Sequence, residues 1–294
     1  MREKESFFFE REGEPLSIER ITVRDIQPTL PAQNETVMVL QRNAKDIREA
    51  GDEFGALDKK AVETTHAEAR QFFDTLFAEL EEEERDTISI MVVASDATLL
   101  IQNGQPCEHR RAIETADIII QALKESMVQF NVPESSFLNS DSSNGEPIAV
   151  SELRDLLMFE ESPEFVKYMT DKYGTGKEFW IAYETDAEKE TRIAMGVEGP
   201  KEIADRVNYA LTVRARIASE YHKANPDTRL VVWNVSHYDS ISPFIKEHIV
   251  GVDVTGYLPV EHSGGITLQI DDKGQPHATI QNQKVTFKDK TYGK

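Results

Sequence analysis

Three short apolar runs rich in β-branched residues constrain the fold of this 294-residue chain more than any other feature. They occupy residues 36–40, 88–94 and 230–235, and they are separated by segments whose apolar residues recur every three or four positions. Strands that alternate with helices are typical of βαβ units and of a parallel sheet. We therefore predict an α/β fold with three layers, α/β/α, around a mostly parallel mixed sheet.

Two further stretches complete this plan. Residues 130–198 are rich in Ser, Asp, Glu and Gly, and we interpret them as an inserted α-rich segment that forms a lid or cap, with a short helix over 150–160. After residue 265, short runs around turn residues predict C-terminal antiparallel strands. We expect residues 35–290 to form the main domain, and residues 1–34, interrupted by three prolines, to form an N-terminal extension without an assigned role.

The charge balance excludes some classes of partner. The chain has 33 Lys and Arg residues against 53 Asp and Glu residues, a formal net charge of −20. A nucleic-acid binder needs a basic surface, and an anionic membrane attracts basic segments, so we expect neither partner. No apolar run approaches the roughly 18 residues of a membrane span, and the first residues lack the apolar region of a signal peptide. We therefore expect a cytoplasmic protein.

Two partial motifs do not meet the requirements of the sites they resemble. Gly174-Thr175-Gly176-Lys177 lacks the glycine and the hydroxyl residue of a Walker phosphate loop, because Asp171 and Glu178 take those places. Cys107, the single cysteine, and His109 offer only two metal ligands, and one cysteine excludes an intrachain disulfide. We predict a turn at 174–177, and we expect neither a metal nor another cofactor.

Polar residues suited to an anion follow each of the three predicted strands. Arg42-Asn43 follows the first strand, Ser95 follows the second with Arg110-Arg111 further along, and Ser236-His237 follows the third. In an open α/β sheet, ligands bind outside the carboxyl ends of the strands. An arginine presents a planar fork of donors that matches phosphate oxygens, and a histidine can donate a hydrogen bond. The pattern predicts a phosphate site.

These residues also carry a family resemblance. Arg42-Asn43-Ala44 is similar to the Arg-His-Gly that ends the first strand in the histidine phosphatase superfamily. After Ser95, residues 111–116 match the family's Arg-Ala-x-x-Thr-Ala, which opens a helix, and Ser236-His237 matches its Ser-His after a later strand. The chain thus resembles a divergent member of the phosphoglycerate-mutase-like group over roughly residues 36–285.

The resemblance implies roles for these residues. In the family, a histidine of the first motif attacks phosphorus, the arginines and a second histidine neutralise the developing charge, and a carboxylic acid protonates the leaving oxygen. It implies that Arg42, Arg111 and His237 bind phosphate and that His237 takes part in catalysis. Asn43 occupies the nucleophile position, where an amide can hydrogen-bond a phosphate but cannot carry the phosphoryl group.

The sequence offers two candidates for the acid and more than one activity. Asp141 is the candidate acid, with Glu146 as a second one. The leading hypothesis is a protein that binds a phosphorylated small molecule or a phosphoprotein with lost or impaired phosphohistidine chemistry. The alternatives are an active phosphomonoesterase or phosphomutase, in which water, His109 or His262 replaces the nucleophile, and a structural or interaction protein that shares only the fold. The oligomeric state is not predicted.

Overall fold

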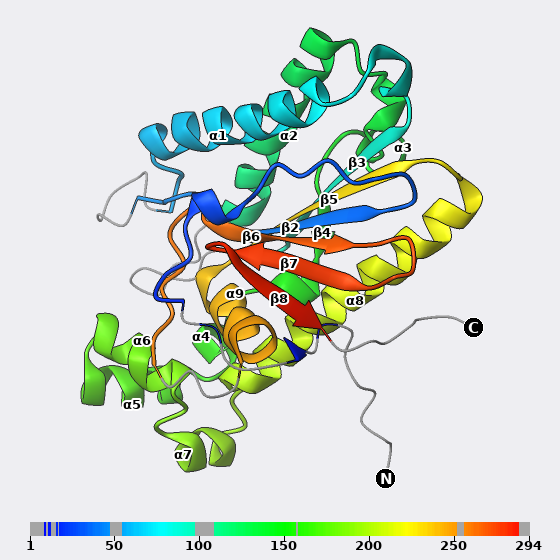
Figure 1. Ribbon diagram of the computed structural model, residues 1–294. Helices are drawn as coiled ribbons and strands as arrows, with labels where there is room; N and C mark the ends of the chain where they lie inside the picture. Colours follow the sequence, from blue (N-terminus) through cyan, green and yellow to red (C-terminus); the bar gives the residue numbers. More distant parts are fainter. Residues whose placement is uncertain are drawn as a thin grey trace.

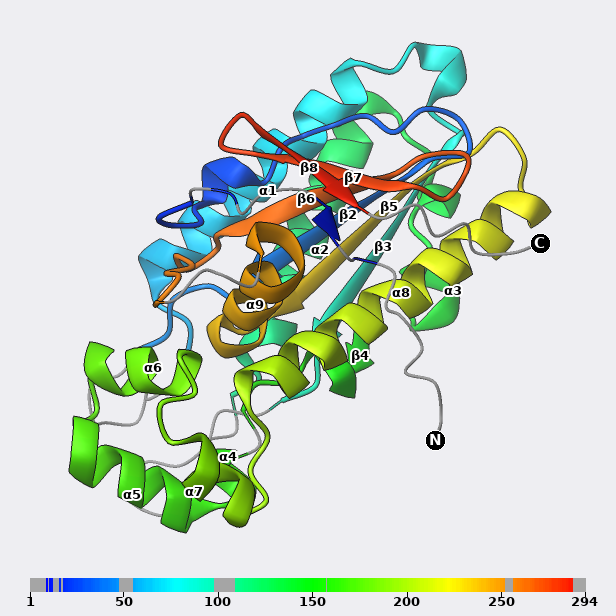
Figure 2. The same cartoon turned by 60° about the horizontal axis from the view of Figure 1, so that its bottom comes forward.

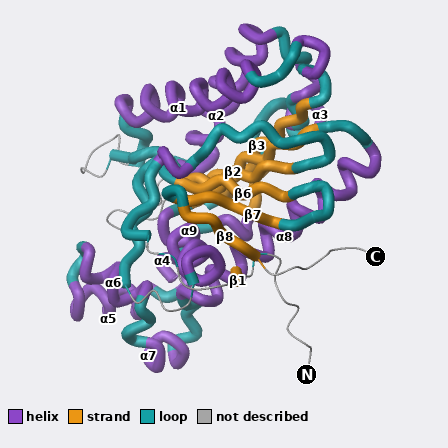
Figure 3. Tube along the Cα trace, in the orientation of Figure 1, coloured by secondary structure: helices purple, strands orange, loops and turns teal. Residues whose placement is uncertain are grey.

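The structure is a computed structural model that describes residues 9, 11–12, 16, 18–47, 55–97, 109–156, 158–251 and 256–287, with only the backbone at 141, 142 and 160. Within these ranges, a sheet lies between two layers of helices (Figure 1, Figure 3). Its strands are β1 (Arg11–Glu12), β2 (Thr36–Arg42), β3 (Ile88–Ser95), β4 (Ile148–Val150), β5 (Arg229–Ser236), β6 (Gly265–Ile270), β7 (Pro276–Ile280) and β8 (Gln283–Phe287). They are arranged in the order β1-β8-β7-β6-β2-β5-β3-β4.

The sheet is parallel in one half and antiparallel in the other. β2 and β3 both pair in parallel with β5, which lies between them, and β4 adds a short parallel strand beside β3. β6 pairs antiparallel with β2, and β7, β8 and β1 continue antiparallel to the edge. The predicted α/β fold is confirmed, including its C-terminal antiparallel strands.

Helices cover both faces of the sheet (Figure 1). On one face lie α1 (Lys59–Ala78) and α2 (Arg111–Phe130), and on the other lie α8 (Pro200–Ala224) and α9 (Tyr238–Phe244). The remaining helices are α3 (Asn139–Ser142), α4 (Met158–Glu161), α5 (Pro163–Tyr173), α6 (Lys177–Glu184) and α7 (Lys189–Ala194), and α9 continues as a π-helix (Ile245–Val250). Single 3-10 turns lie at Val23–Asp25, Glu82–Glu84, Glu134–Ser136 and Ser151–Leu153. No helix formed by the described residues is both long and apolar enough to cross a membrane.

Alternation along the strands builds the two cores. Successive side chains of a strand point to opposite faces of the sheet. Accordingly, Val37 and Val39 of β2 pack in the core between the sheet and helices α1 and α2. Met38 and Leu40 pack in the core between the sheet and helices α8 and α9. Because both faces are covered, β2 and β5 are buried almost throughout, and their central residues form the apolar runs seen in the sequence.

The helices α4 to α7 form a group that projects beyond the end of the sheet (Figure 2). They enclose a small core of their own, which includes Met158, Phe165, Met169 and Phe179. This group falls inside the segment 130–198, which was predicted to be inserted and α-rich. It lies at the end of the sheet where the parallel strands finish (Figure 2).

Two parts of the chain fold differently from the pattern-based expectation. The predicted helix over 150–160 is wrong over most of its length, because β4 ends at Val150, a 3-10 turn follows, and α4 begins only at Met158. Residues 1–34, which received no role, include β1, which pairs with β8. Phe9 is fully buried against the rings of Phe244 and Phe287.

Candidate functional site

The three predicted motifs meet at one end of the sheet because their strands are parallel neighbours. Arg42 and Ser236 are register partners at the ends of β2 and β5, and the backbone N–H of Asn43 donates to the carbonyl oxygen of Ser236 at 2.8 Å. The Nε2 atom of His237 lies 3.1 Å from Oγ of Ser95, at the end of β3. The carboxyl ends of three strands thus place the polar residues of distant segments side by side.

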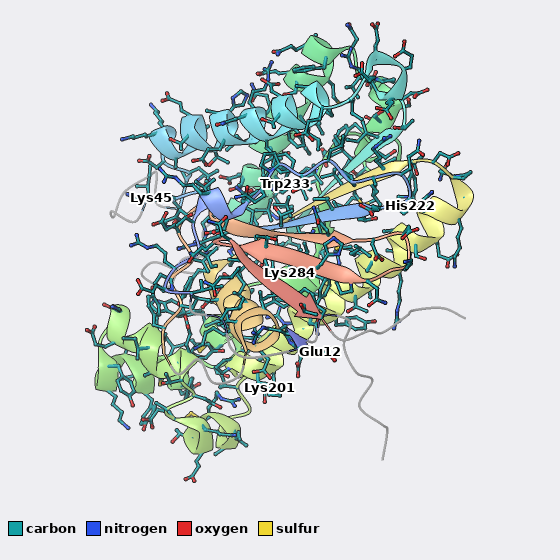
Figure 4. The ribbon with its side chains drawn as sticks, in the orientation of Figure 1. Glu12, Lys45, Lys201, His222, Trp233 and Lys284 are labelled. Atoms are coloured by element: carbon teal, nitrogen blue, oxygen red, sulfur yellow. The ribbon has the colours of Figure 1, made fainter. Side chains whose placement is uncertain are left out.

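A cavity of about 420 Å³ lies at this end of the sheet. Ionisable and amide side chains line part of it: Arg42, Asn43, Lys45, Asp46, Arg111, Asp155, His237, Asp239 and His262. Aromatic side chains and one threonine line the rest: Phe159, Thr175, Trp180, Tyr238 and Tyr257. Figure 4 shows Lys45 at the carboxyl end of β2 and His222 at the opposite end of the sheet. The cavity therefore belongs to the end at which open α/β sheets bind ligands.

Arg42 is anchored beneath the cavity. Its Nη1 donates to the carbonyl oxygen of Val260 at 2.5 Å, and its Nη2 donates to Nε2 of His262 at 3.2 Å. Its guanidinium carbon lies 5.2 Å from the centre of the Tyr238 ring. Burial lowers the pKa of Arg42 to about 10, and the Asp239 carboxylate opposes this effect. Arg42 is therefore a fixed cation at neutral pH.

Arg111 is the first residue of α2, and its side chain lies between two carboxylates. Nη1 is 3.6 Å from Oδ2 of Asp46, and Nη2 is 3.7 Å from Oδ2 of Asp155. A cation at a helix N-terminus is disfavoured by the helix dipole, and the two carboxylates offset that cost. Since both separations exceed a normal hydrogen bond, an anion that entered the cavity could compete for the guanidinium.

Three carboxylates that line the cavity, Asp46, Asp155 and Asp239, were not predicted from the sequence. Asp239 lies two residues after His237 in the first turn of α9, and its Oδ2 accepts from the backbone N–H of Leu156 at 3.2 Å. Burial raises the pKa of Asp239, while the Leu156 N–H, Arg111 and Arg42 oppose that rise. The acid two places after the Ser-His motif was the available signal for Asp239. No sequence pattern indicated Asp46 or Asp155, which approach Arg111 only in the folded chain.

Asn43 occupies a buried position in the cavity, with 2% of its surface exposed. Its Nδ2 donates to the carbonyl oxygen of Ala44 at 2.8 Å. A side-chain amide nitrogen carries two hydrogens, so one more N–H is left for an acceptor. At this position the side chain can offer a donor to an anion and no nucleophilic nitrogen.

The other predicted residues are spread out. His262 lines the cavity, and burial together with Arg42 lowers the pKa of His262 to about 4, so its ring is neutral and accepts from Arg42. His109 pairs with Glu114 at 3.0 Å and is outside the cavity lining. Glu146 is exposed and also outside that lining.

Asp141 lies in α3 with only its backbone described, so its role as the acid stays a prediction. Cys107 lies outside the described residues. Residues 174–176 form the connection between α5 and α6, as the predicted turn requires. The described residues contain no group of three or more His, Cys, Asp or Glu side chains that could hold a metal ion.

No protein-family model and no curated protein matches this sequence. Among solved structures, the chain is similar to the native structure of a mycobacterial glucosyl-3-phosphoglycerate phosphatase, with 16% identity and a TM-score of 0.42 over 84% of this chain and 98% of that chain. It is also similar to mycobacterial hydrolase 2, with 12% identity and a TM-score of 0.42 over 86% of this chain and 88% of that one. Likenesses at this level carry no conclusion about the activity of this chain.

Proposed function

We propose that this chain is a divergent member of the histidine phosphatase superfamily that binds a phosphorylated small molecule or a phosphoprotein, and that its phosphohistidine chemistry is lost or impaired. One observation carries the proposal. Arg42, Arg111 and His237 come from three separate segments and line one cavity together with Asn43. Two guanidinium groups and an imidazole around one cavity provide the donors that a phosphate group requires.

The charged side chains that line the cavity affect how an anion binds there. Arg42, Lys45 and Arg111 face the carboxylates of Asp46, Asp155 and Asp239. Burial raises the pKa of Asp239, while Arg111 and Arg42 oppose that rise, and protonation of this carboxyl would leave the cations of the cavity in excess for an anion. The formal net charge of −20 repels anionic ligands at long range. We therefore expect added salt, which screens this repulsion, to speed association.

Asn43 supports the loss of phosphohistidine chemistry. Covalent phosphoryl transfer needs a nucleophile with an available lone pair, and the amide nitrogen of asparagine has none. The only other histidine that lines the cavity with His237, among the described residues, is His262, whose Nε2 is occupied by Arg42. A binding function is therefore favoured over a phosphohistidine enzyme.

Calorimetric titration with inorganic phosphate tests the proposal. We expect Arg111→Ala to weaken binding by at least about tenfold, because it removes a donor and leaves Asp46 and Asp155 facing the anion. Arg110→Ala is the matched control, since this neighbouring arginine lies outside the cavity lining and should leave the affinity unchanged. Equal affinities of the wild type and a folded Arg111→Ala variant would show that the assigned site is wrong.

One observation favours a second function, an active phosphomonoesterase. Asp239 is a buried carboxyl with a raised pKa in the same cavity as Arg42 and Arg111, an environment that suits a proton donor to a leaving oxygen. Water would then be the nucleophile. If phosphate release from phenyl phosphate is robust in the wild type and is abolished in His237→Ala and Asp239→Asn, this function replaces the leading one. An interaction protein that shares only the fold predicts no phosphate affinity.

A further inference from the structure

Four aromatic side chains, which we call the aromatic wall, line one side of the cavity: Phe159, Trp180, Tyr238 and Tyr257. Successive ring centres are 6.3 Å apart for Phe159 and Trp180, 5.5 Å for Trp180 and Tyr238, and 5.7 Å for Tyr238 and Tyr257. Such spacings are typical of rings in direct contact. The wall is therefore a continuous aromatic surface, built partly by the projecting helices and partly by the segment after β5.

The aromatic wall adjoins the cationic part of the cavity. The guanidinium carbon of Arg42 lies 5.2 Å from the centre of the Tyr238 ring, so one residue faces both the phosphate position and the wall. Tyr238 is only 9% exposed, and its hydroxyl makes no hydrogen bond within the described part of the chain. A buried hydroxyl without a partner is costly, and a ligand in the cavity could supply one.

The wall is only partly covered by protein. Phe159, Trp180 and Tyr257 are each half-buried, although large aromatic side chains gain most when they are fully packed. Ligand sites commonly combine apolar and aromatic walls with a few polar groups that fix orientation. A flat ring placed on this wall would remove apolar surface from water while its phosphate reached the arginines.

The acidic groups of the site limit what else a ligand can carry. Asp46, Asp155 and Asp239 already face the arginines, and the whole chain has a formal net charge of −20. A second anionic group on the ligand, such as a carboxylate beside the phosphate, would meet like charge. The cavity is therefore better suited to a ligand whose only anion is its phosphate.

We propose that the aromatic wall makes this site selective for phosphate monoesters of an aromatic ring without further acidic groups, an inference that rests on the phosphate binding proposed above. The shared chemistry is an aryl phosphate, from a small molecule or from the side chain of a phosphotyrosine. The wall supplies ring stacking and the arginines hold the phosphate. Trp180, at the centre of the wall, is the specificity-determining residue we single out.

Phosphonates test the inference, because they resist hydrolysis and report binding whether or not the protein turns esters over. We expect phenylphosphonate to bind at least about fivefold more tightly than methylphosphonate, and phosphonoacetate more weakly than either. Trp180→Ala should reduce the preference for phenylphosphonate over methylphosphonate to below about twofold, whereas Trp180→Phe should keep this preference above about threefold. Ile193→Ala, an exposed apolar residue of α7, is the control and should keep the wild-type ratio.

Fluorescence gives a second readout. The chain has two tryptophans, and Trp233 is buried in the sheet, so a change of emission that phenylphosphonate causes and Trp180→Phe abolishes reports on the wall. Where Trp180→Ala fails to fold, Tyr257→Leu takes its place. The phosphonate analogue of N-acetyl-phosphotyrosine amide distinguishes the two sources of an aryl phosphate. If it binds more tightly than phenylphosphonate, the ligand is a phosphotyrosine side chain; if it binds more weakly, the ligand is a small molecule.

Two results would overturn the inference, and they are distinguishable. If methylphosphonate and phenylphosphonate bind with equal affinity and Trp180→Ala leaves their ratio unchanged, the aromatic wall has no part in selection, and the phosphate site itself stands. If neither phosphonate nor inorganic phosphate binds the wild type, the proposed phosphate binding is wrong, and the proposed selectivity for aryl phosphates is wrong as well.

Discussion

The Nε2 atom of His237 lies 3.1 Å from Oγ of Ser95, although the two residues are 142 positions apart in the chain. The contact exists because Ser95 ends β3, His237 follows β5, and these strands are parallel neighbours. Oγ of Ser95 also accepts from the backbone N–H of Ala97 at 3.2 Å, which fixes the hydroxyl. The orientation of the imidazole in the cavity is thus set by the ends of two strands.

Asn43→His should restore a nucleophile to the site. The substituted side chain would stand beside Arg42, Arg111 and His237, which hold and neutralise a phosphate group. We expect an acid-labile phosphoprotein to form and phosphate release from phenyl phosphate to rise at least about tenfold above the wild type. Asn43→Ala, which adds no nucleophile, is the control. A folded Asn43→His variant that binds phosphate and forms no phosphoprotein would show that position 43 is not the nucleophile position.

His262 should remain neutral throughout the physiological pH range. Burial and the nearby Arg42 lower the pKa of His262 to about 4, and its Nε2 accepts from the Arg42 guanidinium. In NMR titrations of the histidine side chains, we expect no change of the His262 signals between pH 5.5 and 8. Arg42→Met removes the neighbouring cation, so the pKa of His262 should then rise. A wild-type titration near pH 6.5 would contradict the assigned environment.

Glu184→Gln should make stability less dependent on pH. Burial raises the pKa of Glu184 from 4.5 to about 7, and this exceeds the opposing effects of Lys246 and the Leu258 N–H. Because the folded pKa is raised, the stability that the protonated carboxyl contributes is present below pH 4.5 and is lost as pH rises through 7. The shift corresponds to at most about 3 kcal/mol.

Urea unfolding at pH 5 and pH 8 measures this effect. Glutamine resembles the protonated carboxyl, so the variant should be more stable than the wild type at pH 8 and similar to it at pH 5. The exposed Glu190→Gln, in α7, should change stability at neither pH. A Glu184→Gln variant that is less stable than the wild type at pH 8 would mean that the ion pair with Lys246 outweighs the cost of burial.

Gly265→Ala should destabilise the sheet through a direct clash. A Cβ at position 265 would lie 2.2 Å from the carbonyl oxygen of Leu40 and 2.8 Å from Cα of Gln41, so β6 could not keep its register with β2. We expect the free energy of unfolding to fall by about 3 kcal/mol.

Gly274→Ala provides the comparison, in the turn between β6 and β7. Gly274 has a φ of +82°, and nothing lies within 4 Å of an added Cβ. This substitution costs only the strain of a left-handed conformation, about 1 kcal/mol. Thermal unfolding monitored by circular dichroism separates the two variants. Equal losses would show that the close approach of β6 to Leu40 does not govern stability.

The elements that the sequence predicted well are those that depend on local pattern. The apolar run at 36–40 became β2, which extends to Arg42, and the run at 230–235 became β5. Both strands are buried on two faces, so their own composition reveals them. For the same reason, the polar residues at the carboxyl ends of these strands predicted where Arg42 and His237 would lie relative to the sheet.

Other features were decided only by tertiary structure. Residues 148–150 form a strand because they pair with β3, and no periodicity of their own distinguishes them. The carboxylates of Asp46 and Asp155 meet Arg111 from separate loops, and Trp180 reaches the cavity from α6. Strand ends and helix faces are set by the spacing of neighbouring side chains, which the sequence contains. Ion pairs, raised or lowered pKa values and the aromatic wall depend on burial and on contacts between distant segments, which exist only once the chain has packed.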